Sequence, residues 1–229
     1  MSSKVKRAAG GQHKTMGRGV AGGTAEPAGQ NKKRQTVLAA AVALAVCFLV
    51  GAGLFSAFGS GGTGGTYADI EIRNYGTVTI KLDEKAAPIT TENFVKLAES
   101  GFYDGLTFHR IMEGFMMQGG DPNGNGTGGA EESIVGEFSA NGYKNDLSHT
   151  RGAVSMARSN DYNSASSQFF IVHEDSTFLD GQYAVFGYVT EGMDIVDTIC
   201  GTAKPIDNNG TIPAEEQPVI TAVVIRNEN

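Results

Sequence analysis

The sequence predicts a mostly β domain, built as a closed antiparallel barrel, that follows a single transmembrane helix. Three observations lead to this fold class. Short apolar runs with strand-like spacing recur from Tyr67 onward, only two stretches of that region have helical periodicity, and 32 glycines favour short strands joined by turns. Many strands with two separated helices are typical of a closed antiparallel barrel.

The chain before Tyr67 divides into three segments of different composition. Residues 1–35 are rich in Gly, Ala and Lys, and we expect a disordered basic tail. Residues 36–58 are uncharged and mostly apolar, and a helix of this length would span about 35 Å, enough to cross a bilayer core of about 30 Å. Residues 59–66 have the Gly/Ser/Thr composition of a flexible linker, so residues 67–229 form the globular domain.

The charges that flank the apolar segment predict its orientation. Lys32-Lys33-Arg34 lies just before it, so the N-terminus should stay in the cytoplasm and the domain should lie outside the cell membrane. The alternative is a signal peptide cleaved near Ala57-Phe58-Gly59, which would release a secreted protein. The apolar run and its leading segment are longer than in a usual signal peptide, which favours an uncleaved single-pass anchor.

Composition excludes several classes of function. Eight of the 18 Lys and Arg residues but only one of the 25 acidic residues precede Tyr67, which leaves a net charge of −14 on the remainder. A domain this acidic lacks the cationic field that nucleic-acid binding requires. The two cysteines, Cys47 and Cys200, cannot build a disulfide framework, and the scattered histidines give no metal-ligand spacing. We expect no metal, no cofactor and no nucleic-acid partner.

The globular pattern opens with a hairpin and a helix. Alternating runs at residues 70–72 and 78–82 flank Asn74-Tyr75-Gly76, which predicts two strands and a tight turn. Pro88 is placed to begin a helix that runs to about Glu99, with Gly101 as its stop.

The rest of the domain is again mostly strands. Residues 119–132 are rich in Gly and Asn and lack the Lys-Ser/Thr of a phosphate loop, so they predict an ordinary loop. A second helix is expected over residues 191–199, with Gly201 ending it. Further strands are expected over residues 152–157, 168–173, 184–188 and 218–226.

Two apolar stretches, residues 108–121 and 166–171, carry polar residues where a core strand would not place them. Arg110 stands among Phe, Ile and Met, where a guanidinium is costly unless it is paired or faces a cleft. Gln118 ends the same run against two glycines. The pattern predicts an apolar pocket with a fixed positive donor and an amide at its rim, suited to a neutral substrate.

The complete string Phe-His-Arg-Ile-Met-Glu-Gly-Phe-Met-Met-Gln-Gly-Gly-Asp over residues 108–121 resembles the signature of the cyclophilin family of peptidyl-prolyl cis-trans isomerases. Residues 126–129, 166–171, 179–181 and 185–187 agree with the same family, and the resemblance covers about Tyr67 to Arg226. It implies an eight-stranded barrel capped by two helices. It also implies an enzyme that needs no cofactor and acts on proline-containing peptides.

The resemblance also implies roles for individual residues. It makes Arg110, Phe115 and Gln118 catalytic, and it implies a substrate groove formed by Met116, Gly126, Ala157, Arg158, Ser159, Phe170, Phe178, Leu179 and Tyr183. Three positions depart from the commonest family pattern: Phe178 replaces Trp, Tyr183 replaces His and Arg158 replaces Asn. Because the Trp favours the inhibitor cyclosporin, the departure at Phe178 implies weak cyclosporin binding.

The predicted function is acceleration of X–Pro rotation in unfolded or newly exported proteins. A Ser/His/Asp hydrolase is a poor alternative, since no Gly-x-Ser-x-Gly elbow occurs. The stronger alternative is a non-catalytic module on the same fold that binds proline peptides or acts as a chaperone. The intact set of Arg110, Phe115, Gln118 and Phe170 favours the enzyme.

Overall fold

The computed structural model describes residues 64–228, which form one antiparallel sheet with two α-helices. The strands are β1 (Thr66–Ile72), β2 (Gly76–Leu82), β3 (Phe108–Met112), β4 (Met116–Gly119), β5 (Ala153–Met156), β6 (Phe169–Val172), β7 (Val185–Glu191) and β8 (Ile220–Asn227). The helices are α2 (Pro88–Glu99) and α3 (Met193–Thr202), and three short 3₁₀ turns lie at Ser139–Asn141, Thr177–Leu179 and Ala214–Glu216. The mostly β prediction with two helices is confirmed.

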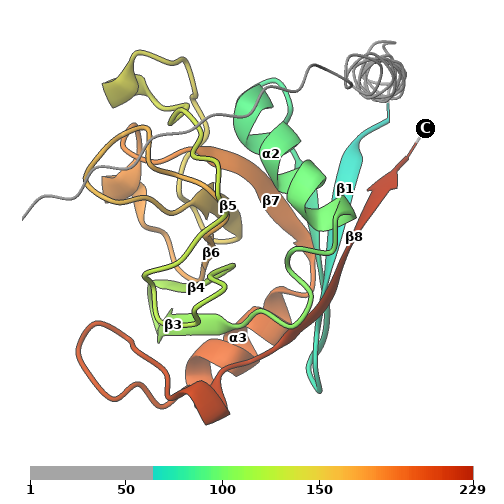
Figure 1. The fold of residues 1–229 in the computed structure, drawn as a ribbon, viewed down its shortest axis with the longest axis vertical. Coiled ribbons are helices and arrows are strands. Elements are labelled where there is room, and N and C mark those ends of the chain that lie inside the picture. Colours follow the sequence, from blue (N-terminus) through green and yellow to red (C-terminus); the bar gives the residue numbers. More distant parts are fainter. Residues whose placement is uncertain (1–63, 229) are drawn as a thin grey trace, which may run out of the picture. The chain divides into compact units, whose positions relative to one another are not determined.

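The sheet is strongly curled, and its strands follow the order β3-β4-β6-β5-β7-β2-β1-β8 (Figure 1). The prediction of a closed barrel is replaced by this curled half-barrel, because the edge strands β3 and β8 share no ladder of pairs. The segment around Thr211 takes the outer edge of β3 instead. Ile111 N–H donates to the Gly210 carbonyl at 2.8 Å, and Ile212 N–H donates to the His109 carbonyl at 3.0 Å. An isolated bridge from Thr107 to Val219 joins the two edges locally.

The first hairpin forms as the alternation predicts. In β1 and β2 the residues Ile70, Ile72, Val78, Ile80 and Leu82 are all buried on one face. The turn between them needs left-handed backbone, which Asn74 (φ 67°) and Gly76 (φ 119°) supply.

The two helices lie at opposite ends of the sheet (Figure 1). Helix α2 has the predicted bounds and buries Phe94 and Ala98 against the core. Helix α3 begins and ends later than the sequence pattern predicts. Gly192 has φ 89° and ends the preceding strand, so α3 begins only at Met193, and Gly201 lies inside the helix rather than ending it.

The strands around β6 are buried on both faces, which explains their continuous apolar runs. Phe169 and Ile171 point into the main core, whereas Phe170 and Val172 join a smaller cluster with Met116, Ala153 and Val185 on the opposite face. This second cluster forms the floor of the pocket described below.

Within residues 64–228, no helix is both long enough and apolar enough to cross a bilayer. The predicted basic tail (1–35), the predicted anchor (36–58) and most of the linker (59–66) lie outside the described residues.

Candidate active site

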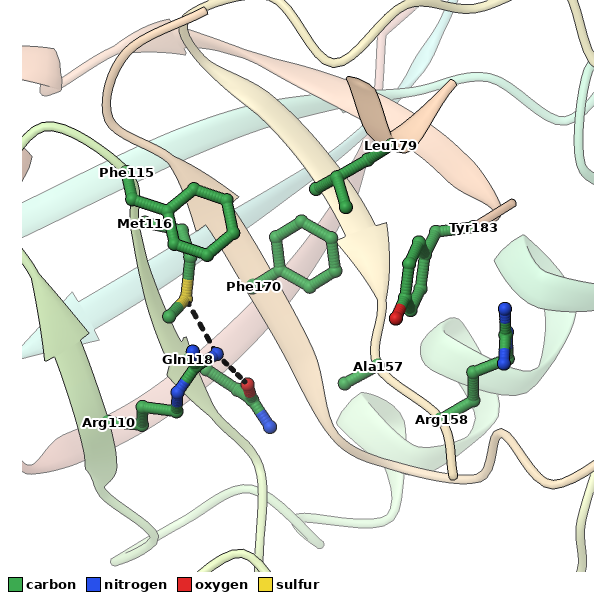
Figure 2. Close-up of a pocket in the computed structure, with 9 residues that line it drawn as sticks. All are labelled: Arg110, Phe115, Met116, Gln118, Ala157, Arg158, Phe170, Leu179 and Tyr183. Carbon is green, nitrogen blue, oxygen red and sulfur yellow. Dashed lines mark hydrogen bonds between the residues drawn. The ribbon is translucent and has the colours of Figure 1, made fainter. Parts of the chain in front are cut away.

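A pocket of about 170 Å³ opens on the face of the sheet that carries the smaller cluster (Figure 2). Its lining consists of Arg110, Phe115, Met116, Gln118, Ala157, Arg158, Phe170, Leu179 and Tyr183. All nine are among the residues that the family resemblance implies for the site. The volume is below the 300–1,000 Å³ or so of drug-sized ligand sites, and it suits one small side chain.

The strand period explains how residues from separate motifs meet. Met116 and Gln118 of β4 share one face, while Met117 between them points into the main core. Gln118 pairs with Arg110 of β3 on one side and with Phe170 of β6 on the other. Antiparallel pairing therefore places the guanidinium, the amide and the aromatic floor in one row.

Arg110 is half-buried, and its guanidinium donates hydrogen bonds to two oxygen atoms and two sulfur atoms. Nε donates to the Asn209 carbonyl at 2.7 Å, and Nη1 donates to Gln118 Oε1 at 3.3 Å. The other contacts are to sulfur, from Nη1 to Met116 Sδ at 3.8 Å and from Nη2 to Met112 Sδ at 3.2 Å. Burial lowers the pKa of Arg110, and Tyr183 and Asp207 oppose that shift. An arginine stays charged under such a shift.

A chain of amides fixes Gln118. Its Nε2 donates to Gln168 Oε1 at 2.8 Å, and Gln168 Nε2 donates to the Gly128 carbonyl at 2.7 Å. Gln118 Oε1 accepts from Arg110, and Nε2 uses one of its two N–H groups on Gln168, so the second N–H is left to donate to a substrate carbonyl. Gln168 is absent from the predicted site, although a polar residue at the start of the apolar run Gln168–Ile171 is the same signal that identified Gln118.

A buried histidine supports the pocket floor. The His149 ring stacks on Phe170 with centroids 5.9 Å apart and planes at 14°. Nδ1 lies 2.8 Å from Asp180 Oδ1, and Nε2 lies 3.1 Å from Ser155 Oγ. Burial lowers the pKa of His149 despite Asp180, which keeps the imidazole neutral as it rests on Phe170. Ser155, His149 and Asp180 resemble a hydrolase triad in type, but the Ser155 side chain is fully buried and does not reach the pocket.

The wall opposite Arg110 consists of Ala157, Arg158 and Tyr183 (Figure 2). The Tyr183 ring meets Phe170 edge-on, with centroids 6.0 Å apart. The Arg158 guanidinium lies over the Tyr183 ring at 4.6 Å.

Three predicted site residues lie outside the pocket lining. Phe178 is 68% exposed, and its ring packs on Phe115 at 5.7 Å, so it extends the rim. Ser159 is exposed, and its hydroxyl donates to Ser164 Oγ at 2.8 Å. Gly126 lies in the loop after β4, where its N–H donates to Asp121 Oδ2 at 2.6 Å and its carbonyl accepts from Gln168 at 3.3 Å.

This arrangement can bind a small apolar ring and hold one strong donor beside it. It offers no activated nucleophile among its lining residues. The chemistry that remains is electrostatic stabilisation of a neutral substrate whose charge distribution changes at the transition state.

Comparison with known proteins identifies such a chemistry. The family model described as cyclophilin type peptidyl-prolyl cis-trans isomerase/CLD matches residues 67–226. A peptidyl-prolyl cis-trans isomerase of Helicobacter pylori (strain J99) is 44% identical over 135 residues, which is 58% of this chain and 80% of the relative. Peptidyl-prolyl cis-trans isomerase B of Bacillus subtilis is 48% identical over 117 residues, which is 51% of this chain and 78% of that protein.

Solved structures agree in fold. A cyclophilin type peptidyl-prolyl cis-trans isomerase of Cryptosporidium parvum superposes with a TM-score of 0.63 at 29% identity, covering 72% of this chain and 99% of the other. A second structure of that protein, in the presence of the dipeptide Ala-Pro, gives a TM-score of 0.62 at 30% identity and covers 71% and 99% of the two chains.

Proposed function

This chain belongs to the cyclophilin-type peptidyl-prolyl cis-trans isomerases, and we propose that the pocket around Arg110 is its active site. The protein is an enzyme, a peptidyl-prolyl cis-trans isomerase (EC 5.2.1.8), that acts on proline-containing peptides. In the proposal Phe115, Met116, Phe170 and Leu179 hold the proline ring, and Gln118 orients a substrate carbonyl.

The reaction requires no bond to be made or broken. Rotation about X–Pro crosses a barrier of about 18–20 kcal/mol and takes tens of seconds or more. An acceleration to milliseconds is about four powers of ten, or about 5.4 kcal/mol. As the amide twists, the prolyl nitrogen loses its resonance with the carbonyl and becomes a hydrogen-bond acceptor. A donor at that nitrogen therefore stabilises the transition state more than either ground state.

One observation carries this proposal. Oxygen acceptors orient the guanidinium of Arg110, while its remaining hydrogen bonds go to methionine sulfur atoms. The Asn209 carbonyl and Gln118 Oε1 fix its direction, and Met112 and Met116 supply only thioether acceptors. A thioether is a weak acceptor, so the prolyl nitrogen can replace it at small cost. A charge-assisted bond formed in this apolar pocket contributes about 1.5–3 kcal/mol.

The enzyme should accelerate a refolding reaction that is limited by proline isomerisation. Refolding of a test protein with a native cis-proline would be followed by fluorescence, with and without catalytic amounts of the full-length protein. We expect the slow phase to shorten in proportion to enzyme concentration. If the protein suppresses aggregation but leaves the slow rate constant unchanged, it is the non-catalytic binding module.

We propose further that the enzyme acts on unfolded or newly exported proteins outside the cell membrane, anchored by residues 36–58. The basic triplet at 32–34 and the uncharged 36–58 segment support this location.

Protease added to intact cells or spheroplasts should then remove the domain and leave a membrane-bound fragment. Protection of the domain until the membrane is opened would contradict the topology. A full-domain fragment in the medium would instead support the cleaved, secreted alternative.

Cyclosporin should inhibit this enzyme more weakly than it inhibits a Phe178→Trp variant. Phe178 lies on the rim, where its exposed ring packs on Phe115, and an indole would add contact area and an N–H donor. The expected gain is about 1 kcal/mol, or about fivefold in the inhibition constant. Equal inhibition constants for the two proteins would show that the rim does not contact the inhibitor.

A further inference from the structure

A second guanidinium, that of Arg158, is held rigidly on the side of the pocket opposite Arg110 (Figure 2). It lies over the rings of Tyr183 at 4.6 Å and Tyr162 at 4.7 Å. Nε and Nη2 both donate to the Gln182 carbonyl, at 3.1 and 2.9 Å, and Nη1 donates to the Ser159 carbonyl at 2.8 Å. Stacking and three hydrogen bonds therefore fix the position of its charge.

That charge has no counterion within the described residues. The acceptors of Arg158 are neutral carbonyls, and no carboxylate of residues 64–228 lies within ion-pair distance of either Arg158 or Arg110. Asp161, three residues further on, accepts the Asn163 N–H at 2.9 Å instead. An arginine has five N–H donors, so two of those of Arg158 make no hydrogen bond within the described residues.

The charge at the pocket is opposite in sign to the net charge of the domain. From Tyr67 onward the chain carries a net charge of −14, yet both ionised side chains that line the pocket are cations. The field of the whole domain repels an anionic peptide at a distance. A peptide in the pocket would lie against both cations, because both side chains line it, and at contact distance their attraction exceeds the screened repulsion of the more distant acidic residues.

Resting on the proposed function, we infer that Arg158 makes the enzyme select X–Pro peptides that carry a carboxylate beside the proline. The preferred substrates are acidic, with Asp or Glu next to the proline or one residue further along the peptide. The prior fixation of Arg158 strengthens the selection, because the guanidinium loses little freedom on binding. A carboxylate at the best position should raise kcat/KM about three- to tenfold over the isosteric amide.

The test uses peptide pairs that differ only by Glu against Gln at each position flanking X–Pro. Both kcat/KM and peptide affinity, from an NMR titration, would be measured for the full-length protein and for Arg158→Gln and Arg158→Lys. Arg73→Gln serves as the matched control. It removes the same charge from an exposed residue in the turn between β1 and β2.

The native protein and Arg73→Gln should both prefer Glu at one position, and salt at about 1 M should weaken that preference as the Debye length falls to about 3 Å. Arg158→Gln should abolish the preference or reverse it through the remaining negative field. Arg158→Lys should retain part of it, since the charge stays but the planar fork is lost.

Two results would overturn the inference. One is equal kcat/KM and equal affinity for Glu and Gln peptides at every position. The other is a Glu preference that survives unchanged in Arg158→Gln, which would assign the preference to Arg110 and leave Arg158 as a structural support for Tyr183. A third outcome is that the protein binds Glu peptides more tightly than Gln peptides and yet isomerises none of them faster than the uncatalysed rate. In that case the proposed function fails, while the inference on charge selection stands.

Discussion

Arg110→Ala is expected to lower kcat/KM for X–Pro isomerisation by about ten- to a hundredfold, corresponding to about 1.5–3 kcal/mol of transition-state stabilisation. The reason is that the planar amide nitrogen of the ground state is a poor acceptor, while the twisted nitrogen accepts the guanidinium N–H. Peptide affinity should therefore change far less than turnover. Arg110→Lys should restore only part of the rate, because an ammonium lacks the fork that bonds Asn209 and Gln118 together.

The competing role for Arg110 is structural, since it joins β3 to the Asn209 segment and to Gln118. That role predicts that melting temperature, peptide affinity and rate fall together in Arg110→Ala. The three quantities would be measured on the native protein, Arg110→Ala and Arg110→Lys. A variant that melts and binds as the native protein does but isomerises slowly supports catalysis, and full turnover in Arg110→Ala rules it out.

Local signals were sufficient for parts of the fold. The bounds of α2 follow from Pro88 at its first turn and the 3.6-residue apolar period, both of which act within the helix itself. The first hairpin follows from a period of two and from residues at 74 and 76 that tolerate positive φ. In each case the interactions that decide the structure lie a few residues apart.

The wrong predictions concern features that depend on contacts between segments far apart in the sequence. A closed barrel requires β3 to pair with β8, yet the Gly210–Ile212 segment occupies the edge of β3. The sequence does not indicate that Gly201 adopts a helical φ, because its conformation depends on how α3 packs. Apolar periodicity reports which residues are buried, not which edge a remote loop will cover.

Which residues line the pocket could be predicted in large part, because polar residues interrupt apolar strands where the strands face it. Arg110 and Gln118 stand out for this reason, and Gln168 could have been found by the same criterion. For Phe178 and Arg158, the sequence does not indicate in which direction the side chain points. Phe178 turns out onto the Phe115 ring rather than into the pocket. The position of Arg158 depends on stacking on Tyr162 and on hydrogen bonds to the Gln182 carbonyl, from two separate loops.

Glu137→Ala is expected to destabilise the domain by about 3 kcal/mol, because it removes the side chain that accepts hydrogen bonds from the N-terminal N–H groups of α2. The residue at the N-cap position, Ala87, has no side-chain acceptor, and no acidic residue lies in the first turn. Glu137 is 2% exposed and comes from a distant loop to accept from Ile89 N–H at 3.1 Å and from the Thr90 N–H and hydroxyl, both at 2.7 Å. Its negative charge also faces the positive end of the helix dipole.

Thermal and urea unfolding would measure the effect. For a domain of this size, about 3 kcal/mol corresponds to a fall of about 6–12 °C in melting temperature. Glu137→Gln keeps one acceptor oxygen without the charge and should lose roughly half as much. Glu92→Gln removes a charge from an exposed position of the same helix and should change stability by less than about 0.5 kcal/mol. Equal stabilities of Glu137→Ala and Glu92→Gln would mean that water can cap α2 as well as the buried carboxylate does. Because Glu137 lies outside the pocket, isomerisation well below the melting temperature should persist in the folded variant, which separates this loss from that of Arg110→Ala.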